Sequence, residues 1–211
     1  MLTRRKALRL STLGFLALAS LGAPDRAEAA PLSLGGVSSY LQAFTQAEAR
    51  FEQLNPDGTT STGKIQIHRP GRMRFDYDAP TNILVIAASG SVNVFDERGR
   101  SEPTVYPLRH TSLSILLERN IDLTRAGGVV GVREVSGLTV VHLQDARDPR
   151  LGQLHLIFER NPVRLHGWVL VDDMGKSTRI TLKDMRKDVD IPASAFHVER
   201  RQRAGAVTHQ R

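Results

Sequence analysis

Hydrophobic residues occupy every second position in two consecutive runs between residues 61 and 80. The apolar positions are Ile65 and Ile67 in the first run, and Met73, Phe75 and Tyr77 in the second. Polar residues fill most positions between them, and Pro70-Gly71 separates the two runs. Because the side chains of a strand alternate between two faces, this pattern predicts a half-buried antiparallel hairpin.

Two other segments repeat their apolar residues at helical spacing. The sets are Leu34, Val37, Leu41 and Phe44 within residues 31–44, and Leu113, Leu116 and Leu117 within residues 111–120. Such spacing places each set on one face of a helix. Thr111 and Ser112 are suited to cap the second helix at its N-terminus. We therefore expect two short amphipathic helices.

The rest of the chain predicts strands separated by short turns. The expected strands are residues 49–54, 83–88, 92–96, 104–108, 129–135, 138–143, 154–159, 165–171 and 177–185, with Phe196-His197-Val198 as a candidate for closing the sheet. Together with the hairpin they give about ten or eleven strands. The pattern favours a mainly β domain with one antiparallel sheet, curled or nearly closed into a barrel.

Two of these segments, residues 83–86 and 165–171, are apolar on both faces. One explanation is a thick core with helices packed on it. The other is an apolar cavity inside a curved sheet, covered by the two helices. Aromatic residues make up 5% of the chain, so the interior would be mostly aliphatic and suited to acyl chains. The pattern alone leaves both explanations open.

The first 29 residues predict a cleaved export signal. Four basic residues precede an apolar stretch that is too short to span a bilayer, and Ala27-Glu28-Ala29 fits a cleavage site. Both the general secretory route and the twin-arginine route fit this start. Residues 30–198 would then form one domain. Residues 199–211 form a basic tail without apolar periodicity, which we expect to be disordered.

The formal net charge of +7 lies mostly at the two ends of the chain. Residues 1–29 and residues 199–211 each carry +3, and the body between them carries only +1. This distribution argues against a nucleic-acid partner. The chain has no cysteine, so an exported protein of this sequence has no disulfides.

No combination of residues predicts catalysis, a metal or a cofactor. Residues 58–64 are similar to a phosphate-binding loop, but Ile65 follows where Ser or Thr would hold magnesium, and the segment continues as a strand. His142, His155 and His166 lie on separate expected strands without the spacing of metal ligands. We therefore expect no enzyme activity.

The hairpin also carries a family resemblance. Phe44-Thr45-Gln46 and then residues 63–80, centred on Arg69-Pro70-Gly71-Arg72, resemble the LolA family of periplasmic carriers of outer-membrane lipoproteins. The resemblance extends over roughly residues 34–198. It implies an incomplete, unclosed antiparallel β-barrel with short α-helices as a lid over an apolar cavity.

The resemblance also implies roles for individual residues. Arg69 would hold the lid closed through hydrogen bonds to the lid backbone, a task that suits the five donors of a guanidinium. The cavity and lid would be formed by Leu34, Val37, Leu41, Phe44, Ile65, Ile67, Met73, Phe75, Leu113, Leu116 and Leu117.

The implied partners follow from the same family. A monomer in the periplasm would bind the acyl chains of lipoproteins, receive them from an inner-membrane lipoprotein-releasing transporter, and pass them to an outer-membrane acceptor or the membrane surface. The chain departs from the family at residues 91–94, where the family often has Trp, and after residue 199. A periplasmic lipid-binding sensor or regulator of similar fold is one alternative, and an enzyme acting on a small lipid or sugar is another.

Overall fold

The computed structural model describes residues 30–96, 102–125, 128–145 and 148–198. The predicted export signal and basic tail lie outside these residues. The helices are α1 (Leu34–Gln42) and α2 (Leu113–Leu116), with the 3-10 helices η1 (Leu108–His110), η2 (Pro149–Leu151) and η3 (Ala193–Phe196). The strands are β1 (Gln46–Leu54), β2 (Thr60–His68), β3 (Arg72–Tyr77), β4 (Ile83–Ala88), β5 (Ser91–Asp96), β6 (Thr104–Pro107), β7 (Val129–Val135), β8 (Leu138–Gln144), β9 (Gln153–Arg160), β10 (Val163–Val171) and β11 (Ser177–Lys187).

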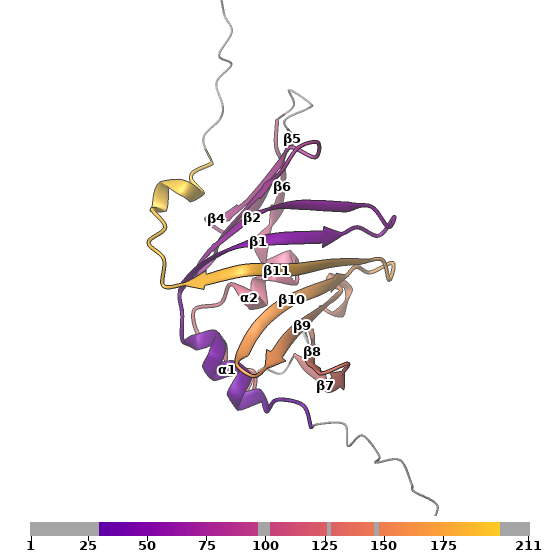
Figure 1. Cartoon of the computed structure of the whole chain (residues 1–211). Coiled ribbons are helices and arrows are strands. Elements are labelled where there is room, and N and C mark those ends of the chain that lie inside the picture. Colours follow the sequence, from indigo (N-terminus) through magenta and orange to yellow (C-terminus); the bar gives the residue numbers. More distant parts are fainter. Residues whose placement is uncertain (1–29, 97–101, 126–127, 146–147, 199–211) are drawn as a thin grey trace, which may run out of the picture.

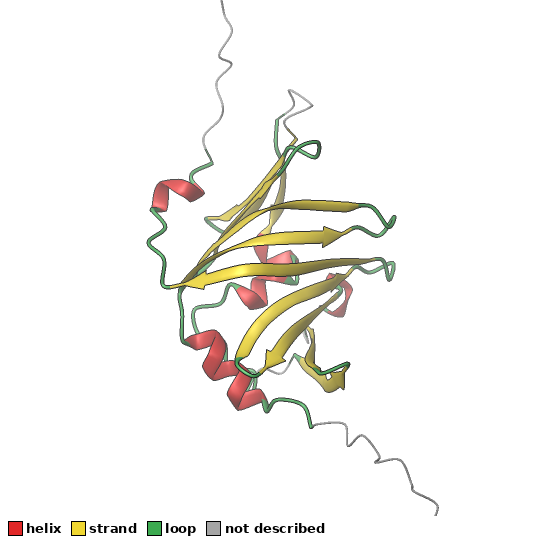
Figure 2. Ribbon diagram, viewed as in Figure 1, coloured by secondary structure: helices red, strands yellow, loops and turns green. Residues whose placement is uncertain are grey.

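All the strands of the described residues form one antiparallel sheet in the order β6-β5-β4-β3-β2-β1-β11-β10-β9-β8-β7. The sheet is curved and strongly twisted, and its end strands β6 and β7 do not pair with each other (Figures 1 and 2). This arrangement confirms the predicted fold class, a mainly β, unclosed antiparallel barrel with short helices. Since β1 pairs with β11, the first and last strands meet in the middle of the sheet.

The hairpin at the centre of the sequence pattern is β2–β3. Ile65 lies opposite Phe75, and Ile67 lies opposite Met73, so the apolar positions share one face as predicted. Gly63 lies opposite Tyr77 on the same face. A Cβ at this position would lie 2.2 Å from the Asp76 carbonyl oxygen and 2.6 Å from the Phe51 ring. Glycine is therefore needed here because the neighbours leave no room for a side chain.

The prediction for the C-terminal segment was wrong. Phe196-His197-Val198 adds no strand, because β11 already pairs with β1 on one side and β10 on the other and offers no free edge. Instead, residues 193–196 form η3 on the outer face of the sheet. There Phe196 is buried in a small cluster with Ile86 and Ile191.

Candidate functional site

The inner face of the sheet holds the main hydrophobic core. Side chains from both halves of the sheet meet there: the ring centroids of Phe75 on β3 and Trp168 on β10 lie 6.5 Å apart. Phe51 contacts Phe75 edge-to-face at 5.4 Å. Because β3 and β10 are separated by three strands in the sheet, the contact between Phe75 and Trp168 crosses the interior of the curved sheet.

Helix α1 covers one part of this interior. Its N-cap is Ser33, whose hydroxyl accepts a hydrogen bond from the Gly36 amide at 3.1 Å. Val37 and Leu41, on the face predicted to be apolar, are fully buried in the core cluster. The Tyr40 ring extends this contact toward β9, edge-to-face with Phe158 at 6.1 Å. The helix thus forms where its apolar stripe can be buried against the sheet.

A second segment, α2 with the loop through residue 123, covers the neighbouring part. Leu116, Leu117, Ile121 and Leu123 of this segment are all buried in the same core cluster. The predicted cap is only partly present, because Ser112 is the N-cap but donates to the Leu151 carbonyl instead of accepting from the helix. We call residues 32–44 and 113–123 the lid.

Two hydrogen bonds join the parts of the lid directly. The Gln42 side chain donates to the Ile121 carbonyl at 2.9 Å. The Leu123 amide donates to the Ser38 hydroxyl at 2.9 Å, and Ser38 is itself buried. Because each bond links α1 to the loop after α2, we expect the two segments to move as one unit.

The turn of the central hairpin contacts both parts of the lid. Arg69 Nη2 donates to the carbonyls of Leu41 and Phe44, at the C-terminal end of α1. The Gly71 amide donates to the Leu117 carbonyl at the end of α2, at 2.9 Å. A single turn therefore binds backbone carbonyls at the ends of two separate helices.

The Arg69 side chain is only 5% exposed, although sequence alone favours an exposed arginine beside Pro-Gly. Burial lowers the pKa of its guanidinium from the ordinary value. Helix-terminal carbonyls compensate the buried charge, because the C-terminal end of a helix is partly negative. The guanidinium carbon also lies 4.9 Å from the centre of the Phe44 ring.

The structure brings almost all of the predicted cavity and lid residues together. Eight belong to the core cluster: Val37, Leu41, Ile65, Ile67, Met73, Phe75, Leu116 and Leu117. Leu34 and Leu113 are partly buried and pack against that cluster. Phe44 is buried beside Tyr40 and Arg69, outside the cluster.

The side chains of the inner face are closely packed against the two helical segments. The gap among Ala47, Ala49, Ile65, Ile67 and Leu182 has no room for a water molecule. A ligand could therefore enter this gap only if the surrounding side chains moved. The inner face thus presents a large apolar surface that the protein's own side chains cover.

Several other residues of this interior were not expected from the sequence, notably Phe51, Phe158 and Trp168 on strands and Ile121 and Leu123 after α2. The alternation of Ala47, Ala49 and Phe51 could have assigned Phe51 to the inner face. Ile121 follows Leu117 at helical spacing, but it lies beyond the end of the helix, where periodicity gives no information.

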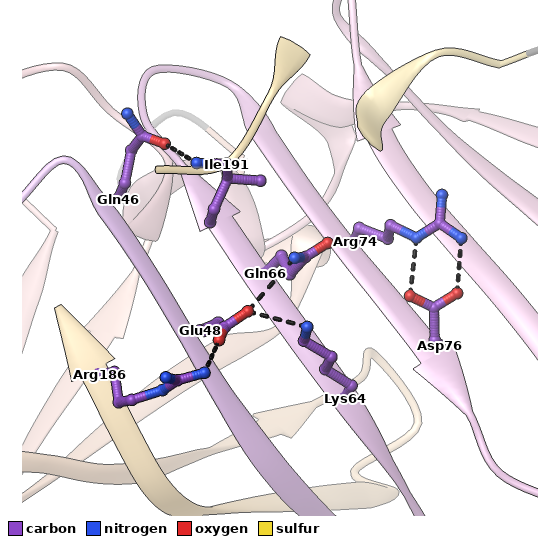
Figure 3. Close-up of polar contacts among 8 residues, drawn as sticks. All are labelled: Gln46, Glu48, Lys64, Gln66, Arg74, Asp76, Arg186 and Ile191. Atoms are coloured by element: carbon purple, nitrogen blue, oxygen red, sulfur yellow. Dashed lines mark hydrogen bonds and ion pairs between the residues drawn. The ribbon is translucent and has the colours of Figure 1, made fainter. Parts of the chain in front are cut away.

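The outer face of the central strands β1, β2, β3 and β11 carries polar side chains (Figure 3). Glu48 binds Lys64 at 2.9 Å and also Arg186, and these contacts lower the pKa of its carboxyl. Beside this network, Arg74 pairs with Asp76 at 2.7 Å. Charged partners thus keep the outer face solvated, while the apolar positions of the same strands point inward.

The C-terminal segment is fastened to this outer face. The Ile191 amide donates to the Gln46 side chain at 2.8 Å (Figure 3). Arg74 donates to the Ala195 carbonyl at 2.9 Å. The segment therefore lies on the side of the sheet opposite the lid.

The three histidines considered as metal ligands do not gather. His142 and His155 face each other on β8 and β9, with ring centroids 4.2 Å apart, whereas His166 pairs with Glu159 at 3.1 Å. Among the described residues, no three His, Cys, Asp or Glu side chains form a possible metal site. No helix in the described part of the chain is long and apolar enough to cross a membrane.

The family model and the relatives that match this chain carry the same description. A family model described as "Outer membrane lipoprotein carrier protein LolA" matches residues 42–199. An outer-membrane lipoprotein carrier protein of Leptothrix cholodnii is 28% identical over 203 residues, covering 92% of each chain. The protein of the same name from Chromohalobacter salexigens is 27% identical over 190 residues, covering 86% of this chain and 89% of its own. A solved LolA superfamily protein from Nitrosomonas europaea aligns at 11% identity with a TM-score of 0.42, covering 79% of this chain and 98% of that chain.

Proposed function

We propose that this chain, which belongs to the LolA family of outer membrane lipoprotein carrier proteins, carries acylated lipoproteins across the periplasm. It would receive them from an inner-membrane lipoprotein-releasing transporter and deliver them to an acceptor or the membrane surface at the outer membrane. The acyl chains would bind on the inner face of the sheet, beneath the lid.

The observation that carries this proposal is the double attachment of the lid to one hairpin turn. Arg69 binds the end of α1, and the Gly71 amide binds the end of α2. The lid residues Val37, Leu41, Leu116 and Leu117 meanwhile occupy the apolar interior. A cargo chain must replace these contacts, so the empty, closed state competes with cargo for the same surface.

This competition suits a carrier that releases its cargo without nucleotide. Each buried methylene contributes about 0.8 kcal/mol, so a chain of about sixteen carbons contributes about 12 kcal/mol before any cost. Such a chain would be held too tightly by an open, preformed cavity. Because the lid contacts must first be broken, their free energy is subtracted from the affinity. Delivery then requires only an acceptor that binds the cargo more tightly.

The proposal is tested by native mass spectrometry of the protein purified from a periplasmic extract. Bound acylated lipoprotein is expected for a carrier, whereas bound free lipid without polypeptide would favour a lipid-binding sensor. A second step mixes the loaded protein with outer-membrane vesicles and measures the lipoprotein that leaves the soluble fraction. Protein that never binds lipoprotein, even when overproduced with one, would contradict the proposal.

A further inference from the structure

Trp168 is the single tryptophan of the chain and belongs to the main core cluster. Its side chain is fully buried on β10, and its ring reaches Phe75 across the curved sheet. It belongs to the same core cluster as the buried lid residues Leu41 and Leu116. An acyl chain bound on the inner face beside Phe75 would therefore lie close to the indole.

The indole nitrogen of Trp168 is buried and finds no hydrogen-bond acceptor among the residues that the structure describes. Buried tryptophan usually finds a partner for its N–H group, because an unpaired buried donor is unfavourable. Two other buried polar side chains on this side of the sheet, Thr139 and Ser38, are paired. Thr139 accepts from the Leu32 amide at 2.8 Å, and Ser38 both donates to Leu34 and accepts from Leu123. The closed state thus leaves an unused donor within an otherwise apolar surface.

An acyl chain offers only one kind of acceptor to such a donor. Its hydrocarbon part has none, whereas the carbonyl of the ester or amide that links it to the head group has two lone pairs. We propose that Trp168 Nε1 donates a hydrogen bond to this linkage carbonyl in the loaded state. The site would then select acyl chains over alkyl chains of equal length. This inference rests on the proposed binding of acyl chains beneath the lid.

The hydrogen bond would also favour loading. The donor is unpaired when the lid is closed and paired when cargo is bound, so its free energy differs between the two states. A ligand shifts an equilibrium only through such a difference. A neutral hydrogen bond of ordinary strength corresponds to about a 2- to 12-fold change in affinity.

The test compares two lipids that differ only in the linkage. The probes are dioctanoyl phosphatidylglycerol, with two ester carbonyls, and its dioctyl-ether counterpart, with none. Wild-type protein is expected to bind the ester about 2- to 12-fold more tightly than the ether, as measured by calorimetry. Trp168→Phe keeps an aromatic ring but removes the donor, so both probes should bind this variant equally.

Phe75→Leu is the matched control, because it changes a neighbouring aromatic ring without removing a donor. It should alter both affinities together and keep the preference for the ester. Equal binding of both probes to wild-type protein would overturn the inference. A preference that survives in Trp168→Phe would also overturn it and would point to Arg69, whose Nη1 is likewise buried without a partner.

The fluorescence of the wild-type protein gives an independent measurement, since all tryptophan emission comes from Trp168. The ester probe should shift this emission to longer wavelength than the ether probe does, and identical spectra would contradict the hydrogen bond. This measurement does not depend on the folding of a variant. If neither probe binds wild-type protein, the proposed acyl-binding function itself fails, which is a different outcome from binding without preference.

Discussion

At the scale of single residues, sequence could identify Arg69 only through the family motif. Its neighbours Pro70 and Gly71 favour a solvent-exposed turn, and no local pattern reveals that the side chain is buried. The contacts that bury it come from residues 25 and 28 positions earlier, Phe44 and Leu41. The apolar lid and strand residues were predictable, because periodicity reports which positions share a face.

Arg69→Leu tests the role of this contact. The change removes the donors but keeps an apolar stem, and a buried charge replaced by an apolar group need not destabilise the fold. Hydrogen bonds from charged groups contribute about 1.5–3 kcal/mol, so losing one would shift the closed–open ratio toward the open state by about ten- to a hundredfold. The variant should load lipoprotein but release it poorly, as scored by separate loading and transfer assays.

Arg72→Leu is the matched control for this variant. The Arg72 guanidinium lies on the outer face of the sheet, 5.9 Å from the centre of the Phe196 ring. The substitution therefore removes the same charge as Arg69→Leu, but on the other side of the sheet. Transfer by this control should be close to wild type. Arg69→Lys should restore transfer only in part, because one ammonium cannot reproduce the planar guanidinium. Normal transfer by Arg69→Leu would show that the contact does not regulate the lid.

At the scale of elements, nearly every strand was predictable, but the C-terminal segment was not. Alternation located the central hairpin and its register, because one face of each strand is buried. The sequence around Phe196 resembles a strand, but β11 lies in the middle of the sheet and has no free edge with which this segment could pair. Strand order depends on contacts distant in sequence, which periodicity cannot report.

The lid should behave as an element that can be loosened while the sheet remains folded. Leu116→Asp places a carboxylate at a site that is 3% exposed, where an unpaired charge is strongly unfavourable. We expect α2 to leave the interior, which raises the binding of a hydrophobic dye and reduces lipoprotein loading. Circular dichroism should still show the native β signal.

Asn120→Asp serves as the control, because it adds the same charge to an exposed position of the same segment. It should change neither dye binding nor loading. If Leu116→Asp also leaves both unchanged, this side chain does not lie beneath a lid that matters for cargo. Loss of the β signal would instead show that α2 is essential for the sheet.

At the scale of the whole molecule, one surface serves both as core and as the proposed binding site. Most small domains bury their apolar residues permanently, because stability depends on that burial. Here the same residues would be covered by the lid in the empty protein and by acyl chains in the loaded one. The end strands β6 and β7 do not pair with each other, so the two halves of the sheet are joined only through β1 and β11. We expect this opening to let the interior widen when the lid is displaced.

The stability of the whole protein should decrease between about pH 7.5 and about pH 5.5. Burial lowers the pKa of His68, His142 and His155, with Arg72 near the first and Arg133 near the other two. His142 also lowers the pKa of His155, whose ring centre lies 4.2 Å from its own. Since the folded pKa values lie below the unfolded value of about 6.5, the unfolded chain binds more protons as pH falls through this range. Above about pH 7.5 neither state binds these protons, so the full stability is present there and is lost on acidification.

Urea unfolding at several pH values measures how the unfolding free energy depends on pH. His142→Gln with His155→Gln should flatten the pH dependence of the unfolding free energy, because two of the three groups no longer titrate. His197→Gln is the control, since this side chain is exposed. Paired carboxylates such as Glu48 and Glu159 have lowered pKa values, so their contribution is lost only at more acidic pH, below about 4.3. An unchanged slope in the double variant between about pH 7.5 and 5.5 would mean that the histidine pair titrates alike in the folded and unfolded protein.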